Sequence, residues 1–200
     1  MDEIVASRRK ITLDRRKVVE KILKDRGDIL LVTGLGAPTW DAAAVGDHPN
    51  NFYLWGGMGG AVLTGLGLAL AQPKRRVLVI TGDGEMLMGV GGLATVAVQK
   101  PSNLAICIMD NQRYGETGMQ ETHTEHGVDL AAMAAGAGFQ KYSTVYNNRE
   151  LAEAIPVLYS EQGPVFVDVK VTDAPQPMTL PPRDGPMLKH RFRENLLGHV

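Results

Sequence analysis

The sequence is poor in cysteine, in aromatic residues and in net charge. Its single cysteine, Cys107, excludes an internal disulfide and an iron–sulfur cluster held by this chain alone, so a reducing, cytoplasmic location is expected. Aromatic residues make up 6% of the chain against 23 glycines, which indicates a packed globular protein rich in tight turns. A formal net charge of −1 lacks the positive field that a nucleic-acid backbone requires, so no nucleic-acid partner is expected.

Long hydrophobic runs are also scarce. The first 26 residues carry nine basic and five acidic side chains and no apolar stretch, unlike a secretory signal. Residues 50–72 carry no formal charge, but five glycines between Gly56 and Gly65 favour a glycine-rich loop and a buried helix over a membrane span. No membrane partner is therefore expected.

Short apolar runs alternate with helical patterns from residue 29 to about residue 171. This alternation predicts an α/β fold with a doubly wound, mostly parallel sheet and helices on both faces. The expected strands are Ile29–Val32, Val77–Ile80, Leu104–Met109, Phe139–Val145 and Pro164–Val171. The expected helices cover residues 37–45, 60–71, 86–98, 129–137 and 148–160, and an amphipathic helix capped by Thr12 or Asp14 precedes them.

The composition changes after Val171, where prolines become frequent. We expect one domain over residues 1–172 and an extended, proline-rich C-terminal arm over residues 173–200. The arm is expected to end in a short helix at Leu188–Leu197 and to pack on another subunit or on its own body.

The segment Val77–Glu85 carries the clearest chemical pattern, because an apolar strand ends in Gly82-Asp83-Gly84 and a helix begins there. Free backbone N–H groups at such a helix start suit phosphate oxygens, and an Asp carboxylate at an exposed strand end can hold a divalent cation. A tight turn with Asp as a helix cap explains the same three residues.

A second strand end strengthens the first interpretation. Asn111 follows the strand Leu104–Met109 and stands 28 residues after Asp83, about one helix and one return strand later. Both side chains are therefore expected at the same edge of the sheet, where carboxylate, amide, backbone and phosphate oxygens together suit Mg²⁺. Thr33–Thr39 follows the first strand to the same edge, so Gly36 and Ala37 are expected to contact a diphosphate, unless this segment is a simple helix cap.

These two segments resemble the cofactor motif of the thiamin diphosphate-dependent enzymes. The resemblance implies Mg²⁺ ligands at the side chains of Asp83 and Asn111 and at the main-chain carbonyl of Arg113. Gly57-Met58-Gly59 looks like the family segment whose large apolar residue supports the bent cofactor. The other implied cofactor contacts are Gly82, Gly84, Glu85, Met86, Tyr114 and Gly115, together with Gly57 and Met58. Glu85 departs from the small residue usual after Gly-Asp-Gly, and a diphosphate repels its carboxylate unless it turns away.

Three longer segments, 51–59, 88–95 and 114–122, narrow the resemblance to the β-subunits of sulfopyruvate and phosphonopyruvate decarboxylases. The resemblance implies a 2-oxo acid substrate and a separate pyrimidine-binding α subunit that supplies the activating glutamate. It also implies an α2β2 or larger complex and no catalytic residue on this chain alone.

The segment Glu121–His126 contains two histidines and two carboxylates. We interpret it as a polar loop or helix start, or as part of a loop over the substrate with Thr117, Gln120 and His123; a zinc site is the third alternative. For the whole chain, the rival functions are a carboligating lyase of the acetolactate synthase type, a 2-oxo acid:ferredoxin oxidoreductase and a non-catalytic nucleotide- or phosphate-binding module.

Overall fold

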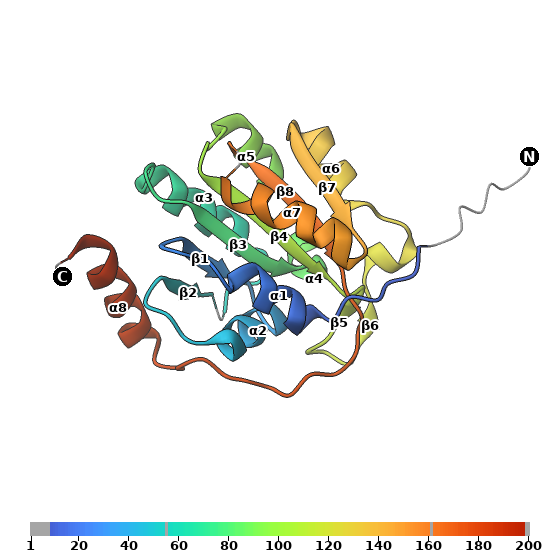
Figure 1. The fold of residues 1–200 in the computed structure, drawn as a ribbon, viewed down its shortest axis with the longest axis horizontal. Coiled ribbons are helices and arrows are strands. Elements are labelled where there is room, and N and C mark those ends of the chain that lie inside the picture. Colours follow the sequence, from blue (N-terminus) through green and yellow to red (C-terminus); the bar gives the residue numbers. More distant parts are fainter. Residues whose placement is uncertain (1–8, 55, 161, 199–200) are drawn as a thin grey trace, which may run out of the picture.

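The computed structural model describes residues 9–54, 56–160 and 162–198. The first eight residues of the charged N-terminal segment and Trp55 of the glycine-rich segment lie outside these ranges. The described residues form one six-stranded sheet with helices on both faces (Figure 1). This architecture confirms the expected doubly wound α/β fold.

All neighbouring strands of the sheet are parallel and lie in the order β2-β1-β3-β4-β8-β7. The strands are β1 (Leu30–Thr33), β2 (Asn51–Tyr53), β3 (Val77–Gly82), β4 (Leu104–Asp110), β7 (Lys141–Val145) and β8 (Val165–Lys170). After β1 the chain moves outward to β2 and returns on the other side of β1 as β3. Ligands of open α/β sheets bind where the strand order reverses in this way, at the carboxyl ends of the strands.

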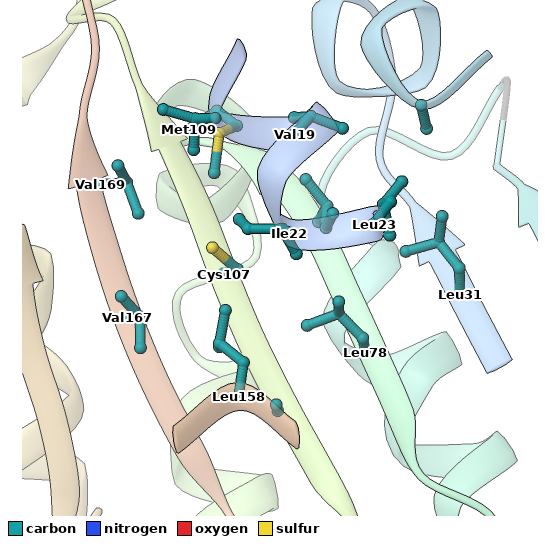
Figure 2. Close-up of a cluster of buried hydrophobic side chains, with 14 of the residues drawn as sticks. Val19, Ile22, Leu23, Leu31, Leu78, Cys107, Met109, Leu158, Val167 and Val169 are labelled. Atoms are coloured by element: carbon teal, nitrogen blue, oxygen red, sulfur yellow. The ribbon is translucent and has the colours of Figure 1, made fainter. Parts of the chain in front are cut away.

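The helices cover both faces because successive side chains of each strand point to opposite sides. Leu78 packs under α1 (Arg15–Leu23) and α7 (Asn148–Ser160), whereas Val77 and Val79 pack against the helices of the other face. Those helices are α3 (Ala61–Ala71), α4 (Asp83–Met88), α5 (Gly92–Gln99) and α6 (Leu130–Ala137). Figure 2 shows the hydrophobic core on the face of the sheet that α1 and α7 cover. Ile22 of α1 lies above the strands, and Cys107 is buried among aliphatic side chains, as expected for this cysteine.

Each of the five expected strands is present within two residues at either end, and α2 (Ala37–Val45) and α7 have the expected bounds. Asp14 is the cap of α1, because its side chain accepts a hydrogen bond from the Lys17 N–H. The strand β2 was not expected. Its three residues are too short for an alternating pattern, and their pairing with β1 decides the assignment.

The continuous helix expected over residues 86–98 is wrong, because two helices, α4 and α5, occupy this region. The chain breaks at Gly89, where a Cβ would lie 2.2 Å from the carbonyl oxygen of Gly59. The backbones of Gly59 and Gly89 are therefore in close contact, and α4 ends at this contact. A hydrophobic pattern alone does not report such a contact.

The proline-rich arm leaves β8 and crosses the molecule to α8 (Gly185–Leu197), which packs beside β2 (Figure 1). Arg16 Nη2 donates to the carbonyl of Pro177 at 2.6 Å, which ties the arm to α1. The rings of Phe192 and Phe52 meet edge to face with centroids 5.5 Å apart. The arm therefore packs on its own chain, one of the two expected outcomes, while the domain boundary at residue 172 stays a prediction.

None of the helices in the described ranges has the length and apolar character needed to span a membrane.

Candidate functional site

The carboxyl ends of β1, β3 and β4 open into a cavity of about 320 Å³. It lies at the reversal of strand order, between the segments that follow β1 and β3. Of the expected site residues, it brings together Gly36, Ala37, Met58, Gly82, Asp83, Gly84, Glu85, Asn111, Arg113, Tyr114, Gly115 and Thr117. Gly57, Met86, Gln120 and His123 do not line it, and the Met86 side chain belongs to the hydrophobic core.

The cavity also has lining residues that the motifs did not predict. They are Arg15, Leu35, Pro38, Trp40, Met109, Glu116, Met119 and Asp173–Gln176. Most come from α1, α2 and the arm, which are remote in sequence from the two strand ends. Only the tertiary packing brings them to this edge of the sheet.

Asp83 is buried at the start of α4 rather than exposed at a strand end, so the expectation of an exposed carboxylate is wrong. Its Oδ2 accepts hydrogen bonds from the hydroxyls of Thr122 and, at 3.2 Å, Thr124. Burial, together with the charge of nearby Asp110, raises the pKa of Asp83 to about 7. The carboxylate is thus held in place at a position where negative charge is costly.

Behind Asp83 lies a chain of buried polar groups. The Thr124 hydroxyl also lies 2.8 Å from Asp110 Oδ1, so its single proton is shared between the two carboxylates. Asp110 forms an ion pair with Lys170, which lies 2.9 Å from Asp168. The ammonium group of Lys170 serves both Asp110 and Asp168 and balances one of their two negative charges. Within the described residues, no lysine or arginine lies within ion-pair distance of Asp83. A divalent cation in front of Asp83 would supply the missing positive charge.

The amide side chain of Asn111 lies at the same edge, and its Oδ1 accepts a hydrogen bond from the backbone N–H of Arg113 at 3.1 Å. No group of three or more His, Cys, Asp or Glu side chains in the described ranges could hold a metal ion. A metal at this edge would therefore depend on Asp83 together with amide, carbonyl and ligand oxygens. This donor set fits Mg²⁺ and does not fit zinc.

Glycines allow segments of the cavity wall to pack closely against one another. A Cβ at Gly84 would lie 2.4 Å from the ring of Tyr114, so the helix start and the loop after β4 touch here. Gly36, with φ of +75°, caps α2 without a side-chain hydrogen bond. The two helix starts present backbone groups to one cavity, and this cradle fits a diphosphate.

Glu85 turns toward the loop after β1. Its Oε2 accepts hydrogen bonds from the Leu35 N–H and the Thr81 hydroxyl, both at 2.7 Å. Burial raises the pKa of this carboxyl group. Glu85 therefore joins the loop after β1 to the start of α4, the orientation that a diphosphate in the cavity would require.

The loop between β5 (Arg113–Tyr114) and β6 (Gln120–Glu121) forms an exposed rim of the cavity. Thr117 and Gln120 are hydrogen-bonded to each other in this loop, at 2.7 and 2.8 Å. His123 starts a short 3₁₀ helix, η1 (His123–His126), outside the cavity. The structure thus gives a helix start at this segment, while a role of the loop over a substrate stays a prediction.

Comparison with known proteins identifies the family. Residues 35–169 match the family described as thiamine pyrophosphate enzyme, C-terminal TPP binding domain. The chain belongs to the thiamine pyrophosphate enzymes. It is 37% identical to the sulfopyruvate decarboxylase subunit beta of Methanothermobacter thermautotrophicus over 93% of this chain and 97% of that subunit.

Two longer proteins resemble this chain over part of their own length. The chain is 33% identical to the sulfopyruvate decarboxylase of Methanosarcina acetivorans, covering 91% of this chain and 47% of that protein. Benzoylformate decarboxylase from Polynucleobacter necessarius shares the fold, with a TM-score of 0.67 and 23% identity over 89% of this chain and 36% of that chain. The family resemblance seen in the motifs is thereby confirmed, and thiamine pyrophosphate, another name for thiamin diphosphate, is the cofactor that the family binds.

Proposed function

We propose that this chain is the diphosphate-binding subunit of a thiamin diphosphate- and Mg²⁺-dependent 2-oxo acid decarboxylase of the sulfopyruvate or phosphonopyruvate type. The cavity carries the proposal, because Asp83, Asn111 and the glycine cradle meet at the reversal of strand order. The similarity to sulfopyruvate decarboxylase β-subunits along nearly the whole chain supports the same activity.

Different residues of the cavity would bind the metal, the diphosphate and the ring portion of the cofactor. Asp83, Asn111 and the carbonyl of Arg113 would hold Mg²⁺, and the backbone at Gly82, Gly84 and Gly115 would hold the diphosphate, with Gly36 and Ala37 on the opposite side. When bound, the cofactor supplies an electron sink for the bond that breaks as CO₂ leaves. Met58, which lines the cavity, would support the ring portion by van der Waals contact.

Among the described residues, the buried carboxylates of the cavity are already hydrogen-bonded and its other two, Glu116 and Asp173, are exposed, whereas activation of the cofactor requires a carboxylate buried against the pyrimidine ring. Glu85 is bonded to Leu35 and Thr81, and Asp83 is bonded to Thr122 and Thr124. We infer that a separate pyrimidine-binding subunit supplies the activating glutamate and that the two chains form an α2β2 or larger complex. The match to less than half of the M. acetivorans protein, and to nearly all of a β-subunit, supports this division.

The same cavity would suit decarboxylation and carboligation, so the two activities are distinguished by their products. The chain should be produced with and without its pyrimidine-binding subunit and supplied with thiamin diphosphate, Mg²⁺ and either sulfopyruvate, phosphonopyruvate or pyruvate. The complex should release CO₂ and an aldehyde from an anionic 2-oxo acid, and the chain alone should release none. Formation of a longer 2-hydroxy-3-oxo acid as the main product would favour the acetolactate synthase type. Robust decarboxylation by this chain alone would contradict the proposed division.

A further inference from the structure

Arg15, the first residue of α1, lines the cavity although no motif points to it. Its side chain is only 8% exposed, and its Nη1 donates to Asp41 Oδ2 at 2.6 Å. Asp41 belongs to α2, whose first residues line the same cavity. The ion pair therefore holds a buried guanidinium beside the start of α2.

The charges around Asp41 do not balance. Arg16 Nε lies 3.0 Å from Asp41 Oδ1, so two guanidinium groups share one fully buried carboxylate. Within the described ranges no other carboxylate lies within 4.0 Å of either arginine, and the group keeps one net positive charge. Arg113, the second arginine of the cavity, lies by contrast within 4.0 Å of Glu125 and Asp173. An excess buried cation calls for an anionic partner.

Two other observations indicate an anion next to this group. A Cβ at Gly36 would lie 2.9 Å from Glu116 Oε1, so the start of α2, which has no acidic residue in its first turn, lies against a carboxylate of the exposed rim loop, and a bound phosphate would have to displace this carboxylate. The indole N–H of Trp40, which also lines the cavity, is buried and has no hydrogen-bond acceptor among the described residues. An acceptor-rich anion at this position would satisfy the helix start, the indole and Arg15 together.

We propose that Arg15 binds the terminal phosphate of the cofactor's diphosphate, with the indole N–H of Trp40 as a second donor. This inference rests on the proposed function. The guanidinium fork matches two phosphate oxygens, and its charge complements a diphosphate whose negative charge Mg²⁺ neutralises only in part. Arg15 thereby adds recognition of the second phosphate to the motif residues, which lie at the ends of β3 and β4.

Calorimetry on the complex with its pyrimidine-binding subunit tests the inference. Mg²⁺ with thiamin diphosphate, thiamin monophosphate or inorganic pyrophosphate is titrated into the wild type, Arg15→Gln and Arg16→Gln. Each variant removes one of the two guanidinium groups on Asp41, but only Arg15 lines the cavity. Arg15→Lys keeps a charge without the fork and serves as the second variant if Arg15→Gln does not fold.

Arg15→Gln should weaken thiamin diphosphate and pyrophosphate binding by about 10- to 100-fold and reduce the preference for diphosphate over monophosphate. Arg16→Gln should weaken binding by less than about 3-fold, and Arg15→Lys should fall between the two. Equal losses in the Arg15 and Arg16 variants, or an unchanged preference for diphosphate, would overturn the inference. Unchanged cofactor affinity with a raised KM for the 2-oxo acid would also overturn it and assign Arg15 to the substrate. Failure of the wild type to bind thiamin diphosphate would instead refute the proposed function.

Discussion

Asp83 shows how one side chain serves both the fold and the site. Its carboxylate accepts hydrogen bonds from two buried threonines and faces the cavity with no basic partner among the described residues. Sequence reasoning located the residue through the Gly-Asp-Gly pattern. It could not reveal the burial, because Thr122 and Thr124 lie about 40 residues further along the chain.

Asp83→Asn should abolish Mg²⁺-dependent binding of thiamin diphosphate while the protein stays folded. The amide has the size of the carboxylate and can still accept from one threonine, but it lacks the charge that a cation requires. Calorimetry of the complex, with circular dichroism as the folding check, measures the effect. Asp83→Ala should in addition lower stability by only about 1 kcal/mol, because it removes the buried hydrogen bond from Thr122 while Thr124 keeps Asp110 as an acceptor. Unchanged cofactor affinity in Asp83→Asn would refute the metal site.

The raised pKa of Asp83 predicts a pH dependence of metal binding. The folded, metal-free chain holds a proton on Asp83 up to about pH 7, whereas the unfolded chain releases it near its ordinary pKa. The contribution of this group to metal-free stability is therefore complete below about pH 4 and is lost as the pH rises toward 7. Mg²⁺ binds the ionised carboxylate, so its affinity should fall about tenfold from the plateau above pH 7 to pH 6. Titration of the metal at pH 6 and pH 8 measures this effect, and equal affinities would contradict it.

Met58 lines the cavity and is 39% exposed, so it contributes little to the core. Met58→Ala should therefore change the melting temperature little and reduce the turnover number of the complex more than its affinity for thiamin diphosphate. The diphosphate contacts remain, while the support under the reacting ring is lost. Steady-state kinetics and calorimetry on the same preparation separate the two effects. Normal turnover with cofactor bound would place Met58 away from the ring.

At the scale of elements, hydrophobic patterns predicted the helices and strands that bury a clear apolar face. They did not predict β2, whose three residues become a strand only by pairing with β1. The same patterns predicted one helix where α4 and α5 are separate, because the contact between Gly89 and Gly59 is a tertiary feature. Both errors lie where backbone contacts, rather than side-chain burial, decide the path of the chain.

The helix α8 protects the short edge strand β2, and Phe192 makes the main contact. Its side chain is buried and meets Phe52 edge to face. Phe192→Ala should lower the free energy of unfolding by about 3 kcal/mol, measured by urea denaturation, because it opens a gap over an edge strand. Met187→Ala on the exposed side of the same helix should cost less than about 1 kcal/mol. Equal costs for the two variants would show that α8 does not stabilise the sheet through Phe192.

At the scale of the whole molecule, the sequence predicted which strand ends meet, because parallel strands bring their carboxyl ends to one edge. It did not predict Arg15, Trp40 and the arm at the same cavity, since these residues reach it from helices and a crossing segment with no motif. The site is therefore built from two layers. In the proposed function, motif residues at the strand ends would bind the metal and the diphosphate, and residues remote in sequence complete the wall of the cavity.

In the proposed function, this chain holds the diphosphate and metal end of the cofactor, and another chain covers the rest. Anomalous diffraction from crystals of the complex, grown with thiamin diphosphate and Mn²⁺ in place of Mg²⁺, tests the claim most directly. We predict one manganese peak coordinated by Asp83, Asn111 and the carbonyl of Arg113, with the diphosphate against Gly84 and the pyrimidine ring on the partner chain. A manganese peak elsewhere, or a cofactor enclosed by this chain alone, would contradict it.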